Sequence, residues 1–144
     1  MRVRACLYSI AACAFTCSAH AEAPQPDTAG ILAYSDMCLH GESGDLIGDR
    51  VILLRFPDGD YVYVQSAEGE IQPPQLAQAI VSRNNSDIAF RVSKPNGATG
   101  TFKGTITEEA LTGAFENGWL DRAGKPIFRL PRIISRQQNY PKCE

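Results

Sequence analysis

The chain has 144 residues, a formal net charge of −2 and five cysteines. Its length corresponds to one domain, and the acidic balance argues against a nucleic acid or an anionic membrane surface as the partner. Small molecules and other proteins remain as the partners to consider.

Residues 1–21 have the three-part pattern of a secretory signal peptide. A basic start leads into an apolar run over Ala5–Phe15, and the small-x-small site Ala19–Ala21 follows. We therefore predict cleavage after Ala21, a flexible segment over 22–30 and a single domain over 31–144. The mature protein is then expected in the periplasm or outside the cell, and no later apolar run is long enough to span a membrane.

Cleavage changes the cysteine count. The leader contains Cys6, Cys13 and Cys17, so the exported chain keeps only Cys38 and Cys143. Two cysteines in an oxidising compartment predict one disulfide. The alternative is a bacterial lipobox that would attach a lipid anchor at Cys13. We favour cleavage, because Cys13 comes early in the leader and lipidation there would leave Cys17 without a partner.

The charges are distributed unevenly. Residues 22–60 carry eight acids and two arginines, whereas residues 122–143 carry six basic residues and no acid. A basic tail could bind an anionic partner. However, Cys38 lies in the acidic end and Cys143 in the basic end, so we favour an arrangement in which the two ends pack together and neutralise each other.

Short segments of alternating hydrophobicity, separated by turn residues, predict an all-β fold. The first half of the chain contains a weak strand over Ile31–Cys38, a glycine-containing loop over Leu39–Asp49, and strands Arg50–Phe56 and Asp60–Ser66 joined by the turn Pro57–Gly59. Proline presets φ, aspartate bonds its own backbone and glycine accepts a positive φ, so this turn predicts a hairpin.

That hairpin is apolar on both faces. If Gly59 is a bulge residue, Ile52 faces Val64 and Leu54 faces Val62. One stripe then consists of Ile52, Leu54, Val62 and Val64, and the other of Val51, Leu53, Tyr61 and Tyr63 with Arg55 at its edge. We predict that the tyrosine stripe binds a protein partner or a second copy. The alternative is that a loop or the N-terminal segment covers it.

The second half of the chain continues the pattern. Strands are predicted over 76–83, 87–93, 101–107, 110–116 and 126–130. The first of these follows Pro73–Pro74 and could instead begin a short helix; we favour the strand.

The hairpin of residues 101–116 is the sharpest local feature. Its positions pair Phe102 with Phe115 and Ile106 with Leu111, which leaves a cross-strand pair of glycines between two bulky layers. These four bulky side chains are predicted to be core residues. The glycines allow the close approach of another group, relieve crowding where the sheet curves or form the floor of a ligand cavity. Trp119 is a candidate to fill this space.

Strands joined by short connections predict an antiparallel meander of seven or eight strands, closed into a small up-and-down barrel to protect its edges. The stretch Gly100–Gly118, which contains TFKGTITEEALTGAFENG, resembles the late hairpin of small secreted lipocalin-like and avidin-like barrels. The placement of Cys38 and Cys143 is also similar to a lipocalin pattern. The chain lacks the Gly-x-Trp motif that opens true lipocalins, so the resemblance extends to the fold only. It implies small-ligand binding.

The inventory of catalytic residues is short. His40 is the only histidine after cleavage, and it lies in a glycine-rich stretch typical of a loop. No nucleophile elbow, phosphate-binding loop or dinucleotide motif occurs. Aspartates near 45–49 and 58–60 are interpreted as turn formers rather than calcium ligands. We therefore predict no catalytic residue, no metal and no cofactor.

The sequence favours an exported, non-enzymatic protein that binds a small apolar ligand or another protein. The candidate binding residues are Arg55, Tyr61, Tyr63 and Trp119. The alternatives are a small hydrolase or isomerase that uses carboxylates in the barrel, and a structural or inhibitor domain. An open barrel interior would favour a small ligand, a filled interior with exposed tyrosines would favour a protein, and buried carboxylates near His40 would favour an enzyme.

Overall fold

The computed structural model describes residues 30–82, 84, 86–93, 97–133 and 139–143. The predicted signal peptide 1–21, the alternative lipid anchor at Cys13 and the segment 22–29 lie outside this part of the chain. The described residues contain no helix, and so no helix long and apolar enough to cross a membrane.

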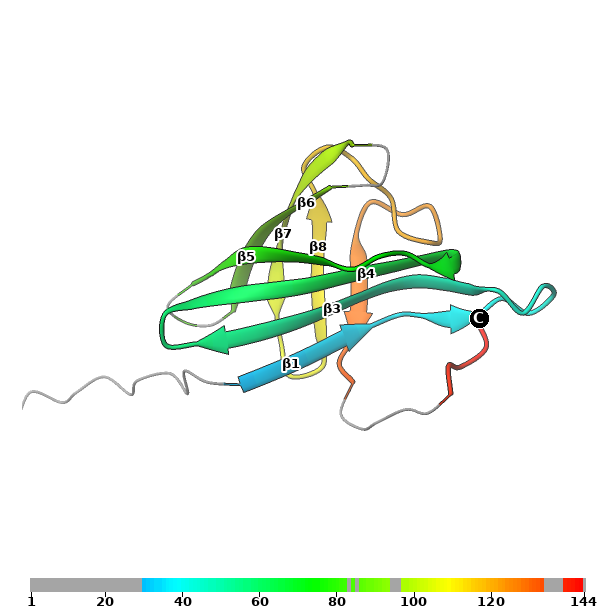
Figure 1. The fold of residues 1–144 in the computed structure, drawn as a ribbon, viewed down its shortest axis with the longest axis horizontal. Helices are drawn as coiled ribbons and strands as arrows, with labels where there is room; N and C mark the ends of the chain where they lie inside the picture. The colour runs from blue at the N-terminus through cyan, green and yellow to red at the C-terminus, as the bar shows by residue number, and fades with distance from the viewer. Residues whose placement is uncertain (1–29, 83, 85, 94–96, 134–138, 144) are drawn as a thin grey trace, which may run out of the picture.

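The described chain forms one antiparallel sheet that curves into a nearly closed barrel (Figure 1). Its strands are β1 (Gly30–Ser35), β2 (Cys38–Leu39), β3 (Leu46–Phe56), β4 (Gly59–Ile71), β5 (Gln75–Val81), β6 (Asp87–Ser93), β7 (Thr99–Ile106), β8 (Ala110–Phe115) and β9 (Phe128–Pro131). Neighbours follow the order β1-β3-β4-β5-β6-β7-β8-β9, and β2 also pairs with β3. The predicted all-β meander is therefore confirmed, with the two-residue β2 as an extra short strand.

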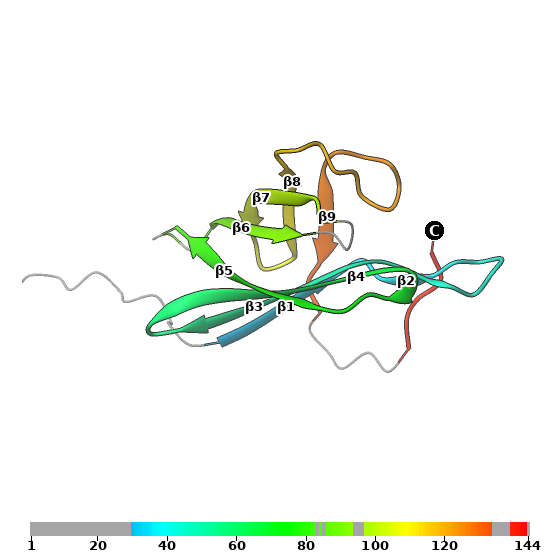
Figure 2. The ribbon, with the colours of Figure 1, turned by 45° about the horizontal axis from the view of Figure 1, so that its top comes forward.

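The barrel is flattened, as Figure 2 shows: β1, β3 and β4 lie on one side, β6 to β9 lie on the other, and β5 passes between them. The last strand returns to the first at one point. Tyr34 of β1 forms an antiparallel bridge with Arg132, and the Ile133 N–H donates to the Ala33 carbonyl at 2.7 Å. This contact joins the two ends of the sheet at one point, directly after the end of β9.

The main core fills the inside of the barrel. Its most completely buried side chains are Tyr34, Leu53, Val62 and Leu111. A second, smaller cluster lies on the outer face of β3 and β4, where Met37, Leu46 and Ala67 pack beneath Leu39 and Tyr140. The C-terminal tail therefore covers part of the outer surface.

The predicted register of the β3–β4 hairpin is wrong by one residue. Phe56 pairs with Gly59, so the loop contains only Pro57 and Asp58, and Gly59 is not a bulge residue. Since side chains alternate between faces, one step moves part of each predicted stripe to the other side.

The observed register distributes the residues of the two predicted stripes differently between the two faces of the hairpin. The core-facing row is Val51, Leu53, Val62 and Val64, which are all buried. The outer row is Ile52, Leu54, Tyr61 and Tyr63, which are half-buried. The tyrosines thus lie on the outer face as predicted, whereas Val51 and Leu53 belong to the core.

The loop predicted over Leu39–Asp49 is also wrong in part, because β2 begins before it and β3 begins within it at Leu46. Gly48 lies inside β3 with a φ of 113°. A Cβ there would lie 2.8 Å from Asp36 Oδ1. This glycine therefore serves the close packing of the kink between β1 and β2 rather than a loop.

The strands predicted for the second half are present, although the last one begins at Phe128 and residue 83 lies outside the described part of the chain. Of the four predicted core residues, Phe102 and Leu111 are buried, whereas Ile106 and Phe115 are partly buried against the core.

The ambiguous segment 76–83 is largely strand β5, and β7 pairs with β8 in the predicted register, with Phe102 opposite Phe115 and Gly104 opposite Gly113. The structure also explains the glycine pair. A Cβ on Gly113 would lie 2.6 Å from Phe102 Cζ, because the Phe102 ring packs over both glycines.

The predicted disulfide between Cys38 and Cys143 is present, with a Cα–Cα distance of 5.0 Å. Backbone hydrogen bonds support it: the Leu39 N–H donates to the Pro141 carbonyl at 2.8 Å, and the Cys143 N–H donates to the Leu39 carbonyl at 2.9 Å. The acidic and basic ends therefore meet, as the cysteine positions predicted.

Candidate ligand-binding pocket

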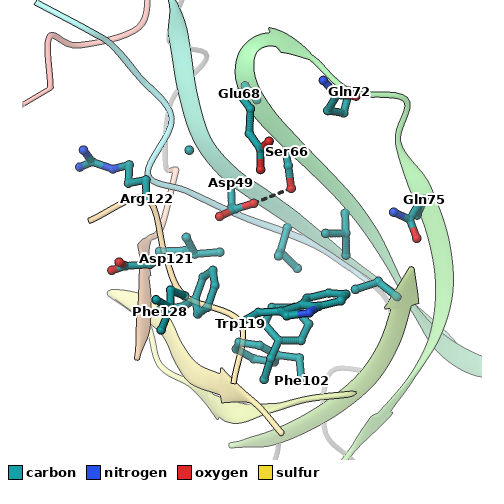
Figure 3. Close-up of a pocket in the computed structure, with 18 of the residues that line it drawn as sticks. Asp49, Ser66, Glu68, Gln72, Gln75, Phe102, Trp119, Asp121, Arg122 and Phe128 are labelled. Atoms are coloured by element: carbon teal, nitrogen blue, oxygen red, sulfur yellow. Dashed lines mark hydrogen bonds between the residues drawn. The ribbon is translucent and has the colours of Figure 1, made fainter. Parts of the chain in front are cut away.

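A pocket of about 550 Å³ occupies one end of the barrel (Figure 3). Core side chains form its floor, including Val51, Val64, Phe90 and Leu130. Its rim contains exposed residues such as Leu120, which is 54% exposed. The barrel interior is therefore filled at one end and open at the other, and we call the open end the mouth.

Tyr34 is one of the side chains that fill the closed end of the barrel. This side chain is 1% exposed, and its hydroxyl donates to the Thr107 carbonyl, 3.4 Å away, at the β7–β8 turn. Burial raises the pKa of Tyr34 above its ordinary value, and the nearby Arg132 charge lowers it by a smaller amount.

Aromatic rings build one wall of the pocket. Phe90 and Phe102 stack with their centroids 4.8 Å apart, and Phe115 lies 4.8 Å from Trp119 and 5.3 Å from Phe128. Phe90, Phe102, Phe115 and Phe128 come from β6, β7, β8 and β9, where alternation points them inward. Trp119 extends this wall from the segment between β8 and β9 toward the mouth.

Polar side chains build the opposite wall, on β3 and β4. Asp49 and Ser66 are cross-strand partners, and the Ser66 hydroxyl donates to Asp49 Oδ1 at 2.5 Å. Glu68 follows on the same face of β4. Figure 3 shows these three side chains across the pocket from Trp119 and Phe102.

The segment between β8 and β9 is held firmly over one side of the mouth. Asp121 Oδ1 accepts the Ala123 and Lys125 backbone N–H groups at 2.9 and 2.7 Å, which fixes the turn. Arg122 Nε lies 3.1 Å from Asp36 Oδ2, and this ion pair ties the segment to the kink after β1. Polar contacts made two to six residues after Trp119 therefore help to fix its position.

A gap between β5 and β6 borders the other side of the mouth. These strands pair only at Ala79–Val81, and their other ends diverge. The Gln75 side chain bridges the gap: its Oε1 accepts the Ser93 N–H at 2.7 Å and its Nε2 donates to the Ser93 carbonyl. This side-chain amide replaces a missing pair of backbone hydrogen bonds in the pocket wall.

The structure separates the four predicted binding residues. Trp119 lines the pocket, whereas Tyr61 and Tyr63 lie on the outer face of β4. Arg55 lies near the end of β3 away from the mouth, on the core-facing row, and pairs with Asp60 at 3.1 Å. The predicted combination of Arg55 with the tyrosines therefore does not form one surface.

The outer face nevertheless carries an apolar stripe. Strand pairing places Leu54 beside Tyr61 and Ile52 beside Tyr63, which is followed by Leu76 on β5. Three side chains at the borders of this stripe are strongly exposed: Ile31 at 72%, Leu76 at 66% and Ile80 at 75%.

His40 lies outside the candidate pocket. It is exposed in the turn before β3, where the Ser43 hydroxyl approaches its Nδ1 at 3.3 Å, and it does not line the pocket. Among the described residues, no charged side chain is buried and no cluster of three or more potential metal ligands occurs.

Asp49, Ser66 and Glu68 are pocket residues that the sequence interpretation misses. Asp49 falls in a segment interpreted as loop, and Glu68 lies beyond the predicted end of its strand at Ser66. The alternation Val62, Val64, Ser66, Glu68 is the signal that could have found them, because it continues the inner face of β4 past the predicted end.

Comparisons of this chain with known proteins give no match. No protein-family model, no curated protein and no solved structure matches the chain.

Proposed function

We propose that this protein is an exported, non-enzymatic binding protein that holds a small, largely apolar molecule in the mouth of its barrel. The observation that carries this proposal is the pocket of about 550 Å³. Ligand sites typically occupy roughly 300–1,000 Å³, are lined mainly by apolar and aromatic side chains, and often lie in barrel mouths. The pocket has each of these properties.

The chemistry of the walls supports binding over catalysis. The aromatic wall offers water few hydrogen-bond partners, so an apolar ligand that displaces this water gains free energy. His40, the histidine that the predicted mature chain keeps, lies outside the pocket. The Cys38–Cys143 disulfide supports the expectation of an oxidising compartment, either the periplasm or the extracellular space.

The test uses a neutral fluorescent probe, N-phenyl-1-naphthylamine, whose emission rises in apolar surroundings. We expect saturable binding of one probe per chain. Val92→Trp places an indole in the pocket and should abolish binding, whereas Ile80→Trp adds the same group to the outer face and should leave binding unchanged. Circular dichroism establishes that both variants fold. If the probe shows no saturable binding to the wild type, or if both variants bind equally, the pocket is not a ligand site.

A second candidate is self-association through the outer face. The stripe formed by Ile52, Leu54, Tyr61, Tyr63 and Leu76 contains no charged residue. Such a face is complementary to itself, because two copies bring no like charges together. We therefore propose a second copy of this chain as its occupant.

Tyr63→Ser tests this candidate by sedimentation. The variant should dissociate the dimer and change the melting temperature of the monomer only slightly, because a half-buried outer ring adds little to the core. Thr112→Ser, on the face of β8 opposite to Leu111, is the matched control. A wild type that sediments as a monomer at all concentrations would reject this candidate and leave the pocket proposal untouched.

A further inference from the structure

We infer that the ligand of the pocket is an organic cation with an apolar or aromatic body, such as an arylalkyl amine. This inference rests on the proposed function and adds the charge of the molecule. It follows from the unequal walls of one cavity: aromatic rings on β6 to β9 and the β8–β9 segment, and carboxylates on β3 and β4.

The aromatic wall suits both parts of such a molecule. Phe102, Phe115 and Phe128 contact one another edge to face, and Trp119 tilts against Phe115 at an angle of 45°. These rings present apolar faces to a hydrocarbon body. A ring face also carries partial negative charge, so it attracts a nearby cation.

The opposite wall offers acceptors for the cationic group. The Asp49 carboxylate is half-buried and oriented by the hydrogen bond from Ser66, and Glu68 lies next to it at the exposed rim. An ammonium group between these carboxylates would make charge-assisted hydrogen bonds while its apolar body rests on the aromatic wall. Among the described lining residues, Asp49, Glu68 and Asp121 bear carboxylates, and the guanidinium of Arg122 is paired with Asp36.

The same arrangement selects against other charges. A ligand carboxylate in the mouth would face Asp49 and Glu68, so like charges would repel it in a partly desolvated site. A neutral hydroxyl can donate to one of these carboxylates but gains no attraction between full charges. Affinity should therefore fall from amine to alcohol to carboxylate.

Three compounds with the same body test this order: phenylbutylamine, phenylbutanol and phenylbutanoate. Trp119, the single tryptophan of the chain, lines the pocket and reports occupancy through its fluorescence. We expect the amine to bind about tenfold more tightly than the alcohol, and the carboxylate to bind most weakly. Added salt should weaken the binding of the amine and leave that of the alcohol nearly constant.

Glu68→Gln assigns the preference to the rim. It keeps the size of the side chain and should weaken the binding of the amine about fivefold. The binding of the alcohol should weaken by less, because the amide oxygen of glutamine still accepts a hydrogen bond from a hydroxyl. Glu108→Gln makes the same change at the exposed β7–β8 turn, on the end of the barrel away from the mouth, and should change neither affinity.

The outcomes separate this inference from the proposed function. Equal affinities for the three compounds, or tighter binding of the carboxylate, would overturn the cation inference while the pocket remains a ligand site. An equal loss of amine and alcohol binding in Glu68→Gln would also overturn it. If none of the three compounds alters Trp119 fluorescence and the naphthylamine probe does not bind either, the proposed function itself fails.

Discussion

The two ends of the barrel are built from the same strands and differ in how their interiors are filled. At the closed end, Tyr34, Leu53, Val62 and Leu111 are each at most 1% exposed. At the mouth, Phe115 and Trp119 are half-buried and line a pocket. Alternation thus decides which side chains point inward, whereas the neighbouring strands decide whether the space between those side chains is filled.

The pairing of β4 shows how the difference arises. This strand runs from Gly59 to Ile71, but β5 pairs with it only over Asp60–Val64. Beyond Val64, the edge of β4 that faces β5 has no strand paired with it among the described residues. Ser66 and Glu68 on this extension therefore border a pocket rather than a packed core.

The largest expected effect concerns the disulfide, which lies outside both ends. Replacing Cys38 and Cys143 by serine should lower the free energy of unfolding by about 4–5 kcal/mol, because the bond closes a loop of about a hundred residues in the unfolded chain. Denaturant titration measures the loss. Since this mechanism acts mainly on the unfolded state, the folded variant should keep the probe affinity of the wild type. A loss of binding without a loss of stability would show that the disulfide shapes the mouth instead.

The next largest effect concerns Gly104 and Gly113, the cross-strand glycine pair of β7 and β8. Gly113→Ala should destabilise the protein by about 3 kcal/mol, because the new methyl group overlaps backbone and ring atoms that cannot move independently. An added Cβ would lie 2.6 Å from both Gly104 Cα and Phe102 Cζ. Gly41→Ala, where nothing lies within 4 Å of the added Cβ, should stay within about 0.5 kcal/mol of the wild type. Similar stabilities for the two variants would contradict the close packing described for β7 and β8.

The contrast between the two hairpins shows what the sequence can predict. In the β7–β8 hairpin, only one face is bulky and the glycines occupy matching positions, so alternation selects a single register. In the β3–β4 hairpin, both faces are apolar, and alternation fits either register equally well. The turn then decides, and one residue of difference exchanges the places of Ile52 and Val51.

The pocket could be predicted only in part. Trp119 stands out because it is the single tryptophan and follows a turn. Asp49 is missed because the glycines that precede it indicate a loop, although this part of the chain belongs to strand β3. The volume of the cavity depends on side chains from several strands that are distant in sequence and on the point where β5 leaves β4. No local pattern contains that information.

A matched pair of substitutions on β4 measures the difference between the two ends directly. Val62 and Val64 share the inner face, but Val62 is 0% exposed, whereas Val64 is 9% exposed and lines the pocket. Val62→Ala should cost about 2.5 kcal/mol, because it adds a cavity to a closed core, and Val64→Ala about 1.5 kcal/mol, because it only widens an existing space. Urea titration of both variants gives the comparison. Equal losses would mean that the mouth is packed as tightly as the closed end.

The smallest expected effect depends on pH and concerns Tyr34 at the closed end. Near neutral pH, Tyr34→Phe should cost only about 0.5 kcal/mol, because the hydroxyl makes one long hydrogen bond. Burial raises the pKa of Tyr34 above its ordinary value of 10.0, so the folded state holds the phenol proton more tightly than the unfolded state. The stability that this contributes is complete below that ordinary pKa and is lost as the pH rises above it.

The wild type should therefore lose more stability than Tyr34→Phe between neutral pH and about pH 11, so that the difference between them shrinks or changes sign. Urea titrations of both proteins at the two pH values provide the measurement, and the remaining tyrosines, which are common to both, cancel. A difference that stays constant across this range would show that the Tyr34 hydroxyl is solvated and that water reaches the closed end as well as the mouth.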